Sequence, residues 1–279
     1  MADAFGIAEV RRALAEDHAT DDVTTRLLGA AAAAPATARF VAEARFVVAG
    51  LPIVANVFHE LDPQSRLTPG ITDGDWAASG DVIATVTGNA GALLAGERVA
   101  LNFIQRLSGI ATLTRRAVDA VAGTPARITH TRKTTPGLRA LELYAVRVGG
   151  GVDNRASLAD AILWKDNHWG LLARDGNSLA AALRRAPPEV PVIVEVETEA
   201  QLEQALAAGV THLLVDNQPP EQLATWARRA GPAVTIQASG GITAENARRY
   251  ADAGAHLIAI GALTHSAPAA SIRCEIVSG

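Results

Sequence analysis

Polar side chains and glycines stand at the ends of six short apolar runs in this 279-residue sequence. In chain order they are Thr131, Arg132, Lys133, Lys165, Glu195, Asp216, Ser239 and Gly261. Charged groups at the ends of buried strands need partners or ligands. Arginine binds planar carboxylates through paired hydrogen bonds, and lysine binds phosphate as a compact charge. The residue types therefore predict a site for a ligand with several anionic groups, to which Arg155 would add a fourth cation.

Glu195 and Asp216 are carboxylates on neighbouring runs. Beside an anionic ligand they suit Mg²⁺ or ribose hydroxyls, because Mg²⁺ prefers oxygen ligands. They can also stabilise positive charge that develops at a sugar carbon. A glycosidase pair is an alternative, which the nearby cations disfavour.

Two glycine segments predict phosphate binding. Ser239-Gly240-Gly241 precedes a helix expected to begin near Thr243, and Ile260-Gly261-Ala262 lies one strand later. Glycine lets main-chain N–H groups approach an anion, and a helix N-terminus adds a favourable dipole. In barrels, adjacent loops of this kind are the usual phosphate site.

The elements that position these residues read as repeated βα units. The apolar runs are residues 126–129, 161–164, 192–196, 212–215, 233–236 and 256–260. Helical segments at 200–208, 221–230 and 244–253 fill three of the gaps. Runs buried on both faces indicate a parallel sheet, and six consecutive units favour a (β/α) barrel, with an open doubly wound sheet as the alternative.

The first part of the chain has a different pattern. Residues 7–15, 51–61 and 91–108 have helical spacing, whereas 38–48 and 81–87 read as strands. Because strands and helices do not alternate strictly there, the pattern is typical of an α+β domain. We therefore expect an N-terminal domain over 1–112 and a barrel domain over 113–279, with the last residues packing back on the first.

Composition limits the classes of partner. The formal net charge is −4, so no global basic field favours nucleic acid. No stretch approaches the roughly 20 apolar residues of a membrane helix. The single cysteine, Cys274, cannot form an internal disulfide, which suits a reducing compartment. These features predict a cytoplasmic protein with no nucleic-acid or membrane partner.

Several longer motifs, in order, carry a family resemblance. They are Asp22-Val23-Thr24-Thr25, Glu97-Arg98-Val99-Ala100-Leu101-Asn102-Phe103, Thr131-Arg132-Lys133-Thr134-Thr135-Pro136-Gly137-Leu138-Arg139, Gly149-Gly150-Gly151, Lys165-Asp166-Asn167-His168, Leu214-Val215-Asp216-Asn217, Ser239-Gly240-Gly241 and Gly261-Ala262-Leu263-Thr264-His265-Ser266. Together they resemble quinolinate phosphoribosyltransferase, the carboxylating nicotinate-nucleotide pyrophosphorylase family, over nearly the whole chain.

The resemblance implies an N-terminal α/β sandwich domain packed on an incomplete (β/α) barrel, in a dimer or larger oligomer. It implies a pentosyltransferase of NAD biosynthesis. Quinolinate and phosphoribosyl pyrophosphate would give nicotinate mononucleotide, pyrophosphate and CO₂, with Mg²⁺ as cofactor.

The resemblance also implies roles for individual residues. Arg132, Arg155 and Lys165 would hold the pyridine carboxylates, with Arg98 reaching across from a partner subunit. Lys133 would lie near the reacting centre and the pyrophosphate. Thr131 and Asn154 fall in the same substrate-binding blocks. Glu195 and Asp216 would serve the ribose and metal, and the predicted 5-phosphate contacts are Ser239, Gly240, Gly241, Ile260, Gly261 and Ala262.

Three departures from the family pattern affect the acceptor side. Asp153-Asn154 stands where the family has Asn-His, His130 replaces an Asp, and Ile193 replaces a Glu. Asn154 offers a carboxylate only neutral donors. A same-fold transferase for another aromatic or heteroaromatic acid is therefore the main alternative. A barrel lyase with Lys133 or Lys165 as a Schiff base and a non-catalytic phosphosugar-binding protein are further alternatives.

Overall fold

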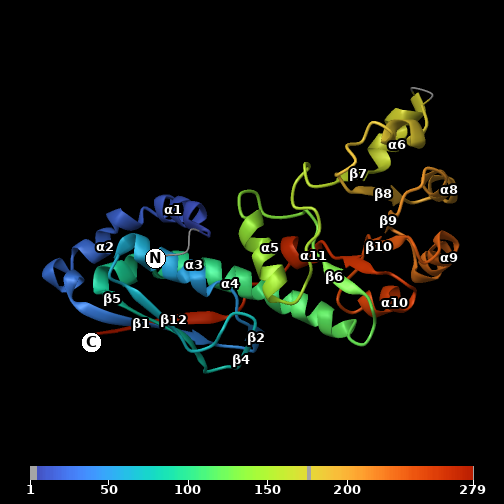
Figure 1. The fold of residues 1–279 in the computed structure, drawn as a ribbon. Helices are drawn as coiled ribbons and strands as arrows, with labels where there is room; N and C mark the ends of the chain where they lie inside the picture. The colour runs from blue at the N-terminus through green and yellow to red at the C-terminus, as the bar shows by residue number, and fades with distance from the viewer. Residues whose placement is uncertain (1–4, 175–176, 279) are drawn as a thin grey trace. The chain divides into compact units, whose positions relative to one another are not determined.

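The structure is a computed structural model that describes residues 5–174 and 177–278 (Figure 1). Its contacts divide the chain into two compact units. The first comprises Met1–Arg115, Thr134–Gly150 and Ser266–Gly279, and the second comprises Arg116–Lys133 and Gly151–His265. The division falls close to the boundary predicted at 112, but the segment Thr134–Gly150, predicted to lie in the second domain, belongs to the first unit.

The first unit is built on a four-stranded antiparallel sheet with the order β12-β1-β5-β3. The strands are β1 (Pro35–Ala42), β3 (Arg66–Pro69), β5 (Val82–Asn89) and β12 (Ile272–Ser278), and β2 (Phe46–Val47) pairs separately with β4 (Trp76–Ala77). The helices are α1 (Ile7–Glu16), α2 (Val23–Arg26), α3 (Leu51–Leu61), α4 (Ala90–Ala120) and α5 (Arg139–Val148). Short 3₁₀ turns are η1 (Ala19–Asp21) and η2 (Gly29–Ala33). Phe40 of β1 packs edge-on against Phe58 of α3 in this core.

A buried ion pair joins two helices of the first unit. Glu142 of α5 is completely buried and accepts hydrogen bonds from Nε and Nη2 of Arg106 in α4, at 3.2 and 2.8 Å. It also accepts from the N–H and Oγ1 of Thr135, at 3.0 and 2.8 Å. Arg106 in addition donates to the carbonyl of Ala267. One carboxylate therefore fixes α4, α5 and the loop before α5 together.

The second unit is a six-stranded parallel sheet with the order β6-β11-β10-β9-β8-β7. Its strands are β6 (Arg127–Thr129), β7 (Ile162–Trp164), β8 (Val192–Val196), β9 (His212–Asp216), β10 (Thr235–Ser239) and β11 (Leu257–Ala259). Its helices are α6 (Asp166–Arg174), α7 (Leu179–Leu183), α8 (Glu199–Ala207), α9 (Pro220–Ala230), α10 (Ala247–Asp252) and α11 (Ala262–His265). α8 and α9 lie on the same side of the sheet (Figure 1). A capping box of Thr198 and Gln201 begins α8, and Pro220 begins α9.

The sheet is an incomplete barrel. Among the described residues, β6 pairs with β11 and β7 pairs with β8, and no ladder joins β6 to β7. The free edge of β6 is instead covered by the segment 151–155, where Val152 N–H donates to the carbonyl of Ile128 at 2.8 Å. Thr129 Oγ1 donates to the carbonyl of Val152, also at 2.8 Å. The predicted fold class, an N-terminal sandwich with an incomplete (β/α) barrel, is confirmed.

Apolar side chains fill the sheet interior one layer below the strand ends. Ala161, Ile193 and Leu214 form a buried cluster, and Leu163 packs against it. Ile193 stands two residues before Glu195, so the two side chains lie on the same face of β8. The layer therefore separates the polar strand ends from the rest of the sheet interior.

Some predicted element boundaries were wrong. The run predicted at 233–236 is β10 at Thr235–Ser239, displaced because the buried Gln237 interrupts the apolar pattern. Gln237 Oε1 pairs with Nε2 of His212 at 2.9 Å in the interior of the sheet. The helix predicted at 91–108 runs on to Ala120. The barrel interior thus holds polar residues that apolar periodicity does not reveal.

Candidate active site

The predicted site residues other than Arg98 all lie in the second unit. Most stand at or just beyond the carboxyl ends of its strands, whereas Asn154 and Arg155 lie in the loop before β7. Thr131, Arg132 and Lys133 follow β6, and Lys165 follows β7. Glu195 is near the end of β8, and Asp216 and Ser239 end β9 and β10, where they are register partners. The parallel strands bring these residues to one rim.

Two arginines on this rim lie close together. Burial and the neighbouring charge of Arg132 lower the pKa of Arg155, and the charges of Glu195 and Asp160 oppose this effect. The buried Nε of Arg132 has no hydrogen-bond partner among the described residues. Arg155 itself donates from Nη1 to the carbonyl of Ala161 at 3.3 Å. A bound anionic group would relieve the repulsion between Arg132 and Arg155 and would give the buried Nε of Arg132 an acceptor. The pair therefore fits an anion-binding site.

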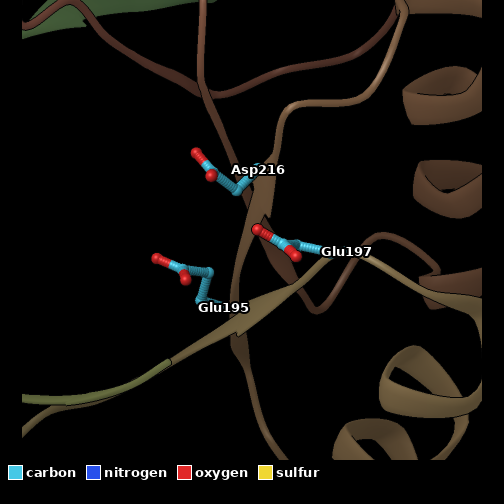
Figure 2. A group of neighbouring side chains, drawn as sticks. All are labelled: Glu195, Glu197 and Asp216. Atoms are coloured by element: carbon cyan, nitrogen blue, oxygen red, sulfur yellow. The ribbon is translucent and has the colours of Figure 1, made fainter. Parts of the chain in front are cut away.

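Three carboxylates gather beside the arginines. Oxygen atoms of Glu195, Glu197 and Asp216 all lie within 4.8 Å of one another. Figure 2 shows them pointing to the same side from the ends of two neighbouring strands. Burial, and then the charge of Asp216, raise the pKa of Glu195, and the N–H of Asp166, at 3.4 Å from Oε1, opposes this shift. The cluster carries excess negative charge that a divalent cation can neutralise.

The raised pKa of Glu195 gives a test on the metal-free protein. Its folded-state pKa lies above the ordinary 4.5, so the folded protein holds this proton more tightly than the unfolded chain, and stability falls as pH rises through that window. At neutral pH, Glu195→Gln is therefore expected to raise the melting temperature measured in a chelator. Added Mg²⁺ should raise the melting temperature of the wild type by more than that of the variant. A variant less stable than wild type in chelator would contradict the charge argument.

Glycines shape the rim at the ends of β10 and β11. Gly240 has φ +90°, and a Cβ there would lie 2.2 Å from Oδ1 and 2.6 Å from the main-chain N of Asn217. Asn217 N–H in turn donates to the carbonyl of Ser239 at 3.0 Å. Gly261 lies against the Lys133 side chain, whose Cδ is 3.2 Å from the position of an added Cβ. Thr264 Oγ1 donates to the carbonyl of Lys133 at 2.8 Å, which ties this lysine to the loop after β11.

The helix expected to begin near Thr243 begins instead at Ala247. The intervening turn is closed by Asn246, whose Oδ1 accepts the N–H of Thr243 at 2.8 Å and whose Nδ2 donates to the carbonyl of Gly241 at 3.1 Å. Main-chain amides of the glycine loop, rather than the first turn of α10, are therefore the donors available to an anion here.

Gly240→Ala is expected to lower the free energy of unfolding by about 2 kcal/mol, since the new methyl group meets main chain in a left-handed conformation. It should also raise the KM for a phosphorylated substrate held by this loop. Gly241→Ala is the matched control, because φ is +61° there and no atom lies within 4 Å of the added Cβ. Urea unfolding and steady-state kinetics compare the two, and equal losses would contradict the close approach at Gly240.

Sequence reasoning left Glu197 out of the metal set. Glu195 and Glu197 are two residues apart at a strand end, a spacing that places both on one face, so the sequence did indicate Glu197.

The contacts of Trp169 and Asp160 are not indicated by any sequence pattern. Trp169 Nε1 donates to the carbonyl of Glu195 at 2.9 Å. Asp160 accepts the N–H groups of Ala156 and Ser157 at 2.8 and 2.9 Å and so orders the loop after Arg155.

Arg98 lies in α4 within the first unit, and its side chain is exposed. Its predicted role beside the acid stays a prediction.

Comparisons with known proteins identify the family of this chain. Residues 22–108 match the model of the quinolinate phosphoribosyl transferase N-terminal domain, and residues 110–275 match that of the C-terminal domain. The chain belongs to the quinolinate phosphoribosyltransferase family. The resemblance inferred from the sequence motifs is thereby confirmed.

Relatives of the quinolinate phosphoribosyltransferase family match over most of their length. A probable carboxylating nicotinate-nucleotide pyrophosphorylase of Bacillus subtilis is 42% identical over 94% of this chain and 90% of its own. The carboxylating nicotinate-nucleotide pyrophosphorylase of Mycobacterium leprae is 42% identical over 92% of both chains. The crystal structure of NadC from Streptococcus pyogenes superposes with a TM-score of 0.89 at 36% identity, over 97% of this chain and 95% of that one. None of the helices in residues 5–174 and 177–278 has the length and apolar character to span a membrane.

Proposed function

We infer that the chain transfers the phosphoribosyl group of phosphoribosyl pyrophosphate to quinolinate, giving nicotinate mononucleotide, pyrophosphate and CO₂ in NAD biosynthesis. The observation that carries this function is the arrangement of one barrel rim. Arg132 and Arg155 lie near each other, and Glu195, close to Arg155, belongs to the cluster of three carboxylates. The loops that contain Gly240 and Gly261 lie against Asn217 and Lys133.

Arg132, Arg155 and Lys165 form the acid-binding half in this proposal. An acid with two carboxylates would balance the positive charges of the two neighbouring guanidiniums. It would also give the buried Nε of Arg132 a hydrogen-bond acceptor. Thr131 supports Lys133 by accepting its N–H through Oγ1 at 3.2 Å.

Mg²⁺ is proposed as the cofactor, held by Glu195, Glu197 and Asp216. The donor set fits, since three carboxylates with a raised pKa at Glu195 favour a hard divalent cation. When bound, the cation neutralises charge on the pyrophosphate. Glu195 and Asp216 would also stabilise positive charge that develops at the anomeric carbon.

The chemistry requires positioning rather than a protein nucleophile. The pyridine nitrogen attacks the anomeric carbon as the bond to pyrophosphate breaks, and Lys133 stabilises the departing negative charge. Alkylation makes the ring cationic, so the electron pair of the C2–carboxylate bond stays on the ring as CO₂ leaves, and a proton then fills C2. Main-chain N–H groups of the loops Ser239-Gly240-Gly241 and Gly261-Ala262 are proposed to bind the 5-phosphate. Ile260 supports the second loop instead, because its N–H donates to the carbonyl of Thr129 at 3.1 Å.

The experiment is incubation of the protein with Mg²⁺, phosphoribosyl pyrophosphate and quinolinate, with CO₂ and nicotinate mononucleotide both measured. We expect the two products in a one-to-one ratio. Nicotinate, which lacks the 2-carboxylate, is the control acceptor and should give little product. Consumption of another aromatic acid with none of quinolinate would favour the alternative acceptor that Asn154 raises.

Self-association as a homodimer or larger oligomer, with Arg98 contributed to the partner's acid site, is also proposed. It rests on the exposure of Arg98, the ninth residue of the 31-residue helix α4. A mixture of Arg98→Ala and Lys133→Ala subunits tests it. Recovery of activity in the mixture supports sharing between subunits, and its absence contradicts it. The cytoplasmic location rests on sequence composition.

A further inference from the structure

His130 follows β6 directly and is completely buried. Its ring Nε2 accepts the main-chain N–H of Asn154 at 3.1 Å. Its carbonyl oxygen accepts from Nδ2 of Asn154 at 3.4 Å. The same histidine therefore holds Asn154 by its main chain and by its side chain.

Asn154 passes this constraint to the next residue. Its Oδ1 accepts the main-chain N–H of Arg155 at 2.8 Å. Both polar atoms of the Asn154 side-chain amide, Nδ2 and Oδ1, are therefore hydrogen-bonded to main-chain groups of the loop. The path runs from the ring of His130 through Asn154 to the backbone of Arg155.

Arg155 needs such a constraint because it does not lie on a strand. The segment 151–155 covers the free edge of β6 through Val152, three residues earlier. No sheet ladder fixes the direction of a side chain at position 155 as the ladders fix Glu195 and Asp216. The charge of Arg132 also lowers the pKa of Arg155, so the two guanidiniums lie near each other and their repulsion opposes that arrangement.

We propose that His130 is a positioning residue for acceptor binding, which fixes Arg155 beside Arg132 by accepting the main-chain N–H of Asn154. The inference rests on the proposed function and deepens it. It assigns the geometry of the quinolinate carboxylate site in part to His130, a residue that would not itself contact quinolinate. The bond requires a lone pair on Nε2, and Oδ1 of Asp153 lies 3.7 Å from the same nitrogen.

Two substitutions of equal length test the acceptor atom. His130→Gln places an amide oxygen near the position of Nε2, whereas His130→Met fills similar space without a strong acceptor. We expect His130→Met to raise the KM for quinolinate about tenfold, equivalent to about 1.4 kcal/mol. The KM for phosphoribosyl pyrophosphate should stay within about twofold, since the glycine loops are untouched, and His130→Gln should recover most of the loss.

Action through Arg155 is tested by a double-mutant cycle. In an Arg155→Met background, adding His130→Met should cause little further loss of quinolinate binding, measured by calorimetry. His130→Phe, a ring without an acceptor, replaces the methionine variant if that variant does not fold. Independent losses from the two substitutions would overturn the proposal, as would a normal KM for quinolinate in His130→Met. If wild type forms no nicotinate mononucleotide, the proposed function fails; if wild type is active and His130→Met is normal, only the positioning role fails.

Discussion

Replacing Lys133 by methionine is expected to lower kcat about 10²- to 10³-fold, the usual loss when one preorganised charge is removed from a transition state. Lys133 follows β6, its main chain is tied to Thr264, and its side chain passes over Gly261. The lost charge should affect the step in which pyrophosphate departs, so quinolinate affinity is expected to change little. Steady-state and single-turnover kinetics measure the two effects separately.

Two control variants make this result specific. Lys133→Arg retains the charge and should lose less activity than Lys133→Met. Arg185→Met removes an exposed cation elsewhere in the second unit and should leave kcat unchanged. A Lys133→Met enzyme with normal kcat would remove Lys133 from the catalytic residues.

Glu142→Ala is expected to lower the free energy of unfolding by about 2 kcal/mol, because it removes a fully buried carboxylate whose hydrogen bonds include two from the charged Arg106, a side chain that is only 29% exposed. Glu142 has no exposed surface and accepts four hydrogen bonds, from Arg106 and Thr135. Urea unfolding followed by circular dichroism should show a lower midpoint with an unchanged dependence on urea.

The matched control is Glu203→Ala, which removes a similar contact from the surface. Glu203 bonds Arg229 at 2.8 Å, but its side chain is 58% exposed, so solvent screens the pair. Its unfolding midpoint should stay near that of wild type. Equal losses in Glu203→Ala and Glu142→Ala would show that burial does not decide the strength of the Glu142 network.

The sequence was sufficient for the barrel and for most of the residue types at its rim. Parallel strands place their carboxyl ends at one edge, so residues such as Lys165 and Asp216 could be assigned to one rim from their position after an apolar run. The prediction for β10 was wrong because Gln237 is polar and yet buried against His212. Periodicity cannot identify a polar residue that is satisfied by a distant partner.

The contacts that organise the acceptor side were beyond sequence reasoning. His130 could be read as a structural or a pocket residue, because its use depends on which group meets Nε2 in the folded chain. Asn154 was assigned to substrate binding, and that assignment stays a prediction, although its amide is bonded to the main chain of the loop. Helix α5 groups with the first unit, where Glu142 joins it to α4 through a pair that no local pattern indicates.

Among the described strands β6 does not pair with β7, and this difference in pairing decides where along the rim substitutions leave the sheet intact. The phosphate side is built between paired strands, where Gly240 has no room for a side chain. The acceptor side is a short loop attached to one strand edge through Val152. Substitutions from 153 to 160 therefore alter the wall around the acid without breaking a strand pair. In the proposed site, a new acceptor preference would arise there while the pairing of β9 with β10 and the glycine loops stay unchanged.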